Sequence, residues 1–235
     1  YSYPIRVTGI KPPFKRFPVV VLPDSQYVQE YGNWSAGVYR RGGLIFIKKS
    51  EMNKNTNTSI LIHEATHGFN EQVLRWDYTN SSWFDEGIAK YMEYLVNRKL
   101  GVPQAEIFGE TVKFNRDGKR YGITSRMKPE DLWNYYKEGN NFMTDWSPDE
   151  HHTKFGYAYS ELLIRKHLME NGYDSMISSY RKLSEVKGKV KDPEKKKQII
   201  MNSLDGDFKP CYSTDREDME VCLEEVNQMN PKIPV

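Results

Sequence analysis

The sequence predicts an α+β fold, in which a small, mostly antiparallel sheet packs on two neighbouring helices and a mainly helical C-terminal part follows. Two observations carry this prediction. Short β-branched runs separated by turn residues fill roughly the first fifty positions. Most later segments instead show apolar residues three or four positions apart, which is typical of helices. We expect residues 1–100 to contain the sheet and both helices, and residues 101–235 to complete a cleft within the same unit.

Length and composition exclude several classes of protein. The 235 residues suffice for one large domain or two small ones, with a core that needs no disulfide. Lys and Arg number 34 against 32 Asp and Glu, and a net charge of +2 argues against a nucleic-acid partner. The 16 Tyr, 10 Phe and 5 Trp argue against intrinsic disorder. No apolar run approaches the ~18–20 residues of a membrane span, so none is expected in this chain.

The N-terminal segments alternate between strand and turn signals. A first strand is expected at 19–22, where a β-branched run lies between prolines. Asp24 can then cap a short helix that ends near Gly32. Residues 36–40 and 44–48 flank a pair of glycines, which predicts a hairpin.

Helical signals begin after residue 53. A polar stretch rich in Asn and Thr precedes a helix expected at 58–74, and a pair of serines precedes another at 83–98. An Asn-Gly pair predicts that a later helix ends near Gly172. Further helices are expected at 129–136, 155–171 and 174–186, from Asp192 and from Thr214.

The two cysteines and the N-terminus bear on location. Cys211 and Cys222 can form one disulfide that closes a short loop, which suits an oxidising compartment, or can stay as reduced, half-buried thiols. The chain begins at Tyr1 without Met or an apolar leader, as a trimmed product or an arbitrary boundary would. These observations assign no location but favour an extracellular or cell-surface one.

One segment carries the strongest chemical signal: His63-Glu64-Ala65-Thr66-His67, inside the helix at 58–74. Positions i and i+4 share a helix face, so both imidazoles can reach one metal ion. The Glu64 carboxylate can reach a water on that ion without becoming a ligand. A catalytic zinc site needs three protein ligands and an open fourth position, so a third ligand must come from elsewhere.

The third ligand is best supplied by Glu86, because only three other histidines occur in the chain. Eighteen residues lie between His67 and Glu86, enough to end one helix, turn back and begin an antiparallel one. Gly87 and Ala89 would let the two helices approach closely. Two histidines at this spacing also occur by accident on ordinary helices, so the downstream Asp-Glu-Gly segment adds specificity.

The H-E-x-x-H helix, the gap and the helix W-F-D-E-G-I-A resemble the gluzincin zinc metallopeptidases, in particular their peptidase MA-like and aminopeptidase N-like branches. The likeness is specific over residues 60–95 and looser over 36–50 and 155–183. It implies hydrolysis of peptide bonds by a zinc-bound water that a glutamate activates, with a peptide or protein as substrate. The implied ligands of a single zinc ion are His63, His67 and Glu86, with Glu64 as the general base.

The resemblance also implies an edge strand on which an extended substrate lies, and residues 36–40 or 44–47 fit that position unless they are ordinary hairpin strands. The aminopeptidase branch carries a G-x-M-E-N motif here, whose glutamate binds the free amino terminus of the substrate. Residues 36–49 contain no acidic residue, which favours an endopeptidase. The alternatives are an exopeptidase with its anchor elsewhere and a non-catalytic zinc-containing binding protein.

A donor for the developing oxyanion and supports for the zinc ligands complete the expected site. The family's tyrosine precedes a helix rich in small residues, which makes Tyr157 the first choice, Tyr159 the second and His152 the third. Asp85 and Glu93 are candidates to accept hydrogen bonds from the histidines, or are solvated carboxylates.

Overall fold

The computed structural model describes the chain in segments, and every structural statement below concerns these residues. They are 16–33, 35–54, 57–74, 82–100, 113–114, 120–121 and 153–186, with single positions beyond them at 192, 195, 199, 202, 203, 217 and 221.

The N-terminal part of the chain forms a three-stranded sheet in the order β1-β3-β2. Strand β3 (Leu44–Lys48) pairs antiparallel with β2 (Gly37–Arg40) and parallel with β1 (Val19–Leu22). The α+β class and the hairpin are therefore confirmed. The three-stranded sheet itself is mixed, because β1 joins the free side of β3 in parallel. A separate antiparallel pair joins β4 (Lys113–Phe114) to β5 (Arg120–Tyr121).

Helices cover both faces of this sheet. Residues directly opposite in an antiparallel pair share a face, so Tyr39 lies with Ile45 on one face, and Val38 lies with Phe46 on the other. Helix α2 (Asp24–Tyr31) covers the Phe46 face, where the ring centroids of Tyr31 and Phe46 are 5.5 Å apart. Helix α3 (Asn57–Leu74) packs mainly on β2, and the 3-10 helix η1 (Lys49–Asn53) leads into this part of the chain.

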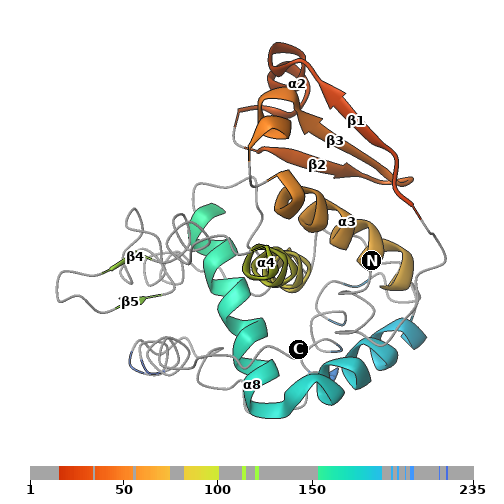
Figure 1. Ribbon diagram of the computed structural model, residues 1–235. Coiled ribbons are helices and arrows are strands. Elements are labelled where there is room, and N and C mark those ends of the chain that lie inside the picture. The colour runs from red at the N-terminus through yellow and green to blue at the C-terminus, as the bar shows by residue number, and fades with distance from the viewer. Residues whose placement is uncertain are drawn as a thin grey trace.

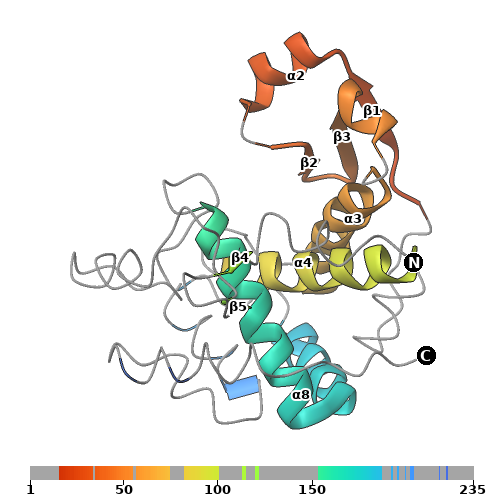
Figure 2. The same cartoon turned by 60° about the vertical axis from the view of Figure 1, so that its left-hand side comes forward.

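The helices then follow one another away from the sheet. Helix α4 (Ser82–Lys99) packs between α3 and α8 (Thr153–Val186), as Figures 1 and 2 show. Both sides of α4 are consequently buried, and its side chains supply much of the core. Its large fully buried side chains are Trp83, Phe84, Ile88 and Tyr91.

The contact between α4 and α8 depends on Gly87. A Cβ atom at this position would lie 2.5 Å from the carbonyl oxygen of Ser160 in α8 and 2.9 Å from Cγ1 of Ile164. No side chain fits there unless the two helices separate. The glycine follows Glu86 directly, so the same turn of α4 sets both the helix spacing and the position of that carboxylate.

Helix α8 bends at Gly172, the residue at which the sequence predicts that a helix ends. Its φ of 75° and ψ of 177° are not helical, and a positive φ of this size favours glycine. The backbone is helical on both sides of this residue. The bend turns the second half of α8 back toward α3 and α4 (Figure 1).

Several predicted features lie outside the described residues: the helix at 129–136, most of the helices expected from Asp192 and Thr214, and both cysteines. Within the described helices, none is long and apolar enough to cross a bilayer.

We predict that Gly87→Ala destabilises the protein by about 1–3 kcal/mol, because the added methyl overlaps the backbone of α8. Helix propensity alone would stabilise the variant by about 1 kcal/mol, so the sign of the change tests the close contact. Denaturant unfolding measures it. The exposed Glu185→Ala in α8 is the control and should shift stability by less than about 0.5 kcal/mol. A Gly87→Ala variant as stable as the parent would contradict the packing described here.

Candidate metal centre

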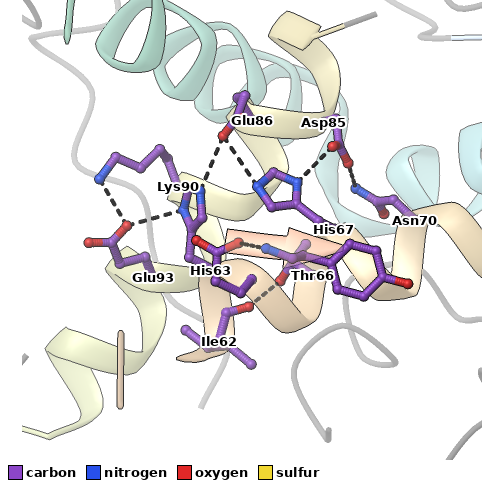
Figure 3. A network of polar contacts seen from close by, with 11 residues as sticks. Ile62, His63, Thr66, His67, Asn70, Asp85, Glu86, Lys90 and Glu93 are labelled. Carbon is purple, nitrogen blue, oxygen red and sulfur yellow. Dashed lines mark hydrogen bonds and ion pairs between the residues drawn. The ribbon is translucent and has the colours of Figure 1, made fainter. Parts of the chain in front are cut away.

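Three side chains from two helices converge on one point. His63 and His67 lie one turn apart on α3, and Glu86 lies on α4. One ligand atom from each lies within 4.8 Å of the others. The Oε2 atom of Glu86 is 3.2 Å from Nε2 of His63 and 3.4 Å from Nε2 of His67 (Figure 3). The structure thus brings together the three residues that the sequence suggests as metal ligands.

Carboxylates on α4 hold the opposite nitrogens of both rings. Asp85 Oδ2 lies 2.7 Å from Nδ1 of His67, and Glu93 Oε2 lies 3.3 Å from Nδ1 of His63. An ionised carboxylate only accepts hydrogen bonds, so Nδ1 of His67 carries a proton, and the Nε2 atoms of both rings are the nitrogens that face Glu86 and could bind a metal ion. Asp85 and Glu93 therefore lie where supports of metal-binding histidines are expected.

This donor set suits a divalent cation such as zinc. The Glu86 Oε2 atom is buried and has no hydrogen-bond partner within the described part of the chain. Two imidazole lone pairs and a carboxylate oxygen repel one another at these distances unless a cation or protons lie between them. Two His nitrogens and one Glu oxygen form a ligand set of catalytic zinc sites, which leaves a fourth position open.

In the metal-free protein, protons take the place of the cation. Burial lowers the pKa of His63, but the facing carboxylates of Glu86 and Glu93 outweigh this and raise it to about 9. His67 likewise has a raised pKa, since Asp85 and Glu86 outweigh its burial. The two imidazoles lower the pKa of Glu86 against the effect of burial. Metal binding must therefore displace protons from these histidines.

Glu64 lies beside the three ligand residues but is held by the sheet. Its Oε2 accepts a hydrogen bond of 2.7 Å from the backbone N–H of Tyr39 in β2. The side chain is buried, and burial raises its pKa, although the neighbouring histidines and the Tyr39 amide act in the opposite direction. Glu64 is thus oriented as a carboxylate next to the centre without being one of the three converging ligands.

Strand β2 is the edge of the sheet that faces this centre. Lys48 N donates to Ala36 O, so these two residues form a hydrogen-bonded pair. Hydrogen-bonded and non-hydrogen-bonded pairs alternate along an antiparallel ladder, so Val38 and Arg40 also bond to β3, whereas Gly37 and Tyr39 do not. The N–H and C=O groups of Gly37 and Tyr39 therefore point away from β3, as the Tyr39–Glu64 bond illustrates. Of the two strands suggested for substrate binding, 44–47 is excluded because β3 is paired on both sides.

Tyr157, on the first half of α8, lies next to the centre. Its ring is 6.0 Å from the ring of His63, edge to face, and Lys90 Nζ lies 5.8 Å above the Tyr157 ring. Lys90 also pairs with Glu93 at 2.8 Å. His152 and the side chain of Tyr159, the other two candidates for this position, lie outside the described residues.

Sequence reasoning missed three contributors: the Tyr39 amide, Lys90 and Asn70. A backbone donor leaves no trace in residue identity, so Tyr39 was not predictable. Lys90 lies four residues after Glu86 and Asn70 three residues after His67, on the faces that carry those ligands. Helical spacing from the ligands was therefore the signal that pointed to both.

Part of the chain is similar to known aminopeptidases. It is 29% identical over 85 residues to aminopeptidase N of Rattus norvegicus, a match that covers 35% of this chain and 9% of the relative. It is 32% identical over 65 residues to the human aminopeptidase N, covering 27% and 7%. It is also 29% identical over 97 residues to endoplasmic reticulum aminopeptidase 2 of Bos taurus, covering 40% and 10%.

No family model matches the chain. Each of these matches spans a tenth or less of the length of the relative. The relationship to the aminopeptidases is thus a distant one that concerns a limited segment, and the His-His-Glu group of the structure is independent evidence for a metal site.

We predict that zinc affinity rises at least about tenfold per pH unit between pH 6 and pH 9, because His63 with its pKa of about 9 gives up a proton to the ion. The stability of the metal-free protein should change in the opposite direction and fall as the pH rises. A raised histidine pKa contributes stability below the unfolded value of 6.5 that is lost as pH rises through about 9. Zinc should therefore raise the melting temperature more at pH 9 than at pH 6. Chelator competition and thermal unfolding measure the two effects, and an affinity independent of pH would contradict the proposed ligands.

Proposed function

We propose that this chain is a zinc-dependent metallopeptidase of the gluzincin type, in which residues 1–100 and 101–235 form one catalytic unit. The observation that carries the proposal is the convergence of His63, His67 and Glu86 beside a separately held Glu64. The partial similarity to aminopeptidases supports it, because those relatives are peptidases by name.

The metal would be held by His63, His67 and Glu86, with the two imidazoles oriented by Asp85 and Glu93. When bound, a single zinc ion supplies a Lewis acid that lowers the pKa of water toward ~7 and polarises a carbonyl group.

Glu64 would act as the general base. The Tyr39 amide holds Oε2, which leaves Oε1 to take a proton from the attacking water. Burial raises the Glu64 pKa, and a carboxylate of raised pKa is a stronger base, so it takes a proton from water more readily. The same oxygen then delivers that proton to the leaving amine as the peptide bond breaks.

Tyr157 would donate a hydrogen bond from its phenol to the oxyanion that develops on the scissile carbonyl. Its position beside His63 supports this role, since a group that stabilises the oxyanion must lie close to the ligands.

The substrate would be an extended peptide on the outer edge of β2. The outward N–H and C=O of Gly37 and the outward C=O of Tyr39 supply main-chain hydrogen bonds that do not depend on the substrate's side chains. No acidic side chain occurs in β2 to bind a free amino terminus. This supports cleavage within chains, and an aminopeptidase-type exopeptidase is the alternative that the named relatives favour.

We predict that Glu64→Gln lowers kcat/KM for peptide hydrolysis by about 10²–10⁴-fold, because an amide cannot accept the proton from water. Zinc content should stay at one ion per chain, since Glu64 is not a proposed ligand. Peptide turnover and elemental analysis measure the two quantities, and the surface variant Glu185→Gln serves as the control. Normal turnover by Glu64→Gln would refute the general-base role. If the zinc-loaded parent leaves diverse peptides intact, a non-catalytic zinc-binding protein is the better description.

We predict that internally quenched peptides with acetylated amino termini are cleaved as well as the matching free peptides, within about twofold. The reason is that β2 offers no carboxylate to a terminal ammonium group. Fluorescence assays on matched peptide pairs and on aminoacyl reporter substrates measure this preference. A loss of cleavage on acetylation, together with rapid turnover of the reporters, would identify an exopeptidase instead.

A further inference from the structure

A chain of buried hydrogen bonds leads from the metal centre to the far half of α8. Asp85, which holds Nδ1 of His67 through Oδ2, accepts a bond of 2.5 Å at Oδ1 from Nδ2 of Asn70. The Oδ1 atom of Asn70 in turn accepts a bond of 2.9 Å from the hydroxyl of Tyr180. Figure 3 shows its first members, Asn70, Asp85 and His67. The four residues joined by these hydrogen bonds are between 0% and 8% exposed, so water does not compete for their bonds.

The direction of every bond in this chain is fixed by chemistry. An ionised Asp85 only accepts, so Asn70 must present its NH₂ group to Asp85 and its carbonyl oxygen to Tyr180. Tyr180 must then be the donor. Burial and the Asp85 charge raise its pKa well above the ordinary value, against the effect of the Asn70 bond, so the phenol keeps its proton.

The hydroxyl of Tyr180 therefore controls which way the Asn70 amide faces. Without it, a flipped amide would place its oxygen against the Asp85 carboxylate, and the unflipped amide would leave a buried carbonyl without a partner. Either result weakens the hold of Asp85 on His67. The Tyr180 ring itself packs independently of the hydroxyl, with its centroid 5.7 Å from that of Phe84 and 6.3 Å from that of Phe69.

We propose that Tyr180 is a positioning residue of the metal centre, which orients Nε2 of His67 through Asn70 and Asp85. This inference rests on the metal site of the proposed function. It adds that the C-terminal half of α8, beyond the bend at Gly172, is part of the apparatus that sets metal affinity. Partners of metal-bound histidines change affinity by 10–100-fold when they are removed. Since Tyr180 acts through two other residues, we expect its effect at about the lower end of that range.

The test is the zinc affinity of Tyr180→Phe, measured by competition with a chromophoric chelator at fixed pH. The variant keeps the ring and loses only the hydroxyl, and we expect about tenfold weaker binding. Tyr173→Phe is the matched control, because it also removes one tyrosine hydroxyl from α8. That hydroxyl makes a part-buried 2.6 Å hydrogen bond with Tyr91 and takes no part in the bonds that lead to His67. It should bind zinc within about twofold of the parent.

A double-mutant cycle with Asn70→Ala separates positioning from general loss of stability. If Tyr180 acts through Asn70, Tyr180→Phe should weaken zinc binding no further once Asn70 is replaced. Circular dichroism and melting of the metal-free variants check that each is folded at the assay temperature. Equal affinities of Tyr180→Phe and the parent, equal losses in Tyr180→Phe and Tyr173→Phe, or additive losses in the cycle would overturn the inference. Failure of the parent itself to bind zinc would refute the proposed function and this inference with it.

Discussion

The architecture depends on one buried carboxylate oxygen that faces two imidazole nitrogens. Glu86 Oε2 lies within 3.4 Å of both Nε2 atoms and is buried, so solvent does not stabilise the negative charge of this carboxylate. Uncompensated charge in such surroundings is strongly unfavourable, so the site must hold either protons or a cation. The packing of the fold keeps these atoms in place. The sheet packs on α3, α3 packs on α4, and α8 packs on the other side of α4.

Two consecutive residues of α4, Asp85 and Glu86, contact the two nitrogens of the His67 ring. Asp85 reaches Nδ1 of His67, and Glu86 faces Nε2 across the ring. The imidazole therefore cannot rotate without losing one carboxylate or the other. His63 lies between Glu86 and Glu93, whose carboxylates are 3.2 and 3.3 Å from its two ring nitrogens and which lie two turns apart on α4. One helix thus supplies both the carboxylate of the candidate site and the carboxylates that contact its two imidazoles, and its register against α3 determines the geometry of the centre.

Local signals explain how much of this could be predicted from the sequence. The helices expected at 58–74 and 83–98 are observed at Asn57–Leu74 and Ser82–Lys99, because polar capping residues and apolar periodicity mark helix ends directly. The grouping of His63, His67 and Glu86 was predictable because two of them share a helix face and the third lies on the next helix.

Contacts between distant segments were not predictable in the same way. The parallel pairing of β1 with β3 depends on where the chain returns, and no turn residue encodes it. Tyr180 lies 110 residues from Asn70, and a buried tyrosine looks in sequence like any of the 16 tyrosines of the chain. The Tyr39 amide belongs to the backbone, which makes it invisible to residue patterns.

The bend at Gly172 has a consequence for the length of α8. The half before it places Tyr157 against His63, and the half after it places Tyr180 at the end of the bonds that lead to His67. A residue added to or removed from either half would rotate one aromatic side chain by about 100° around the helix axis relative to the other. Insertions and deletions between positions 157 and 180 should accordingly be as poorly tolerated as a change in the distance between the two histidines of α3.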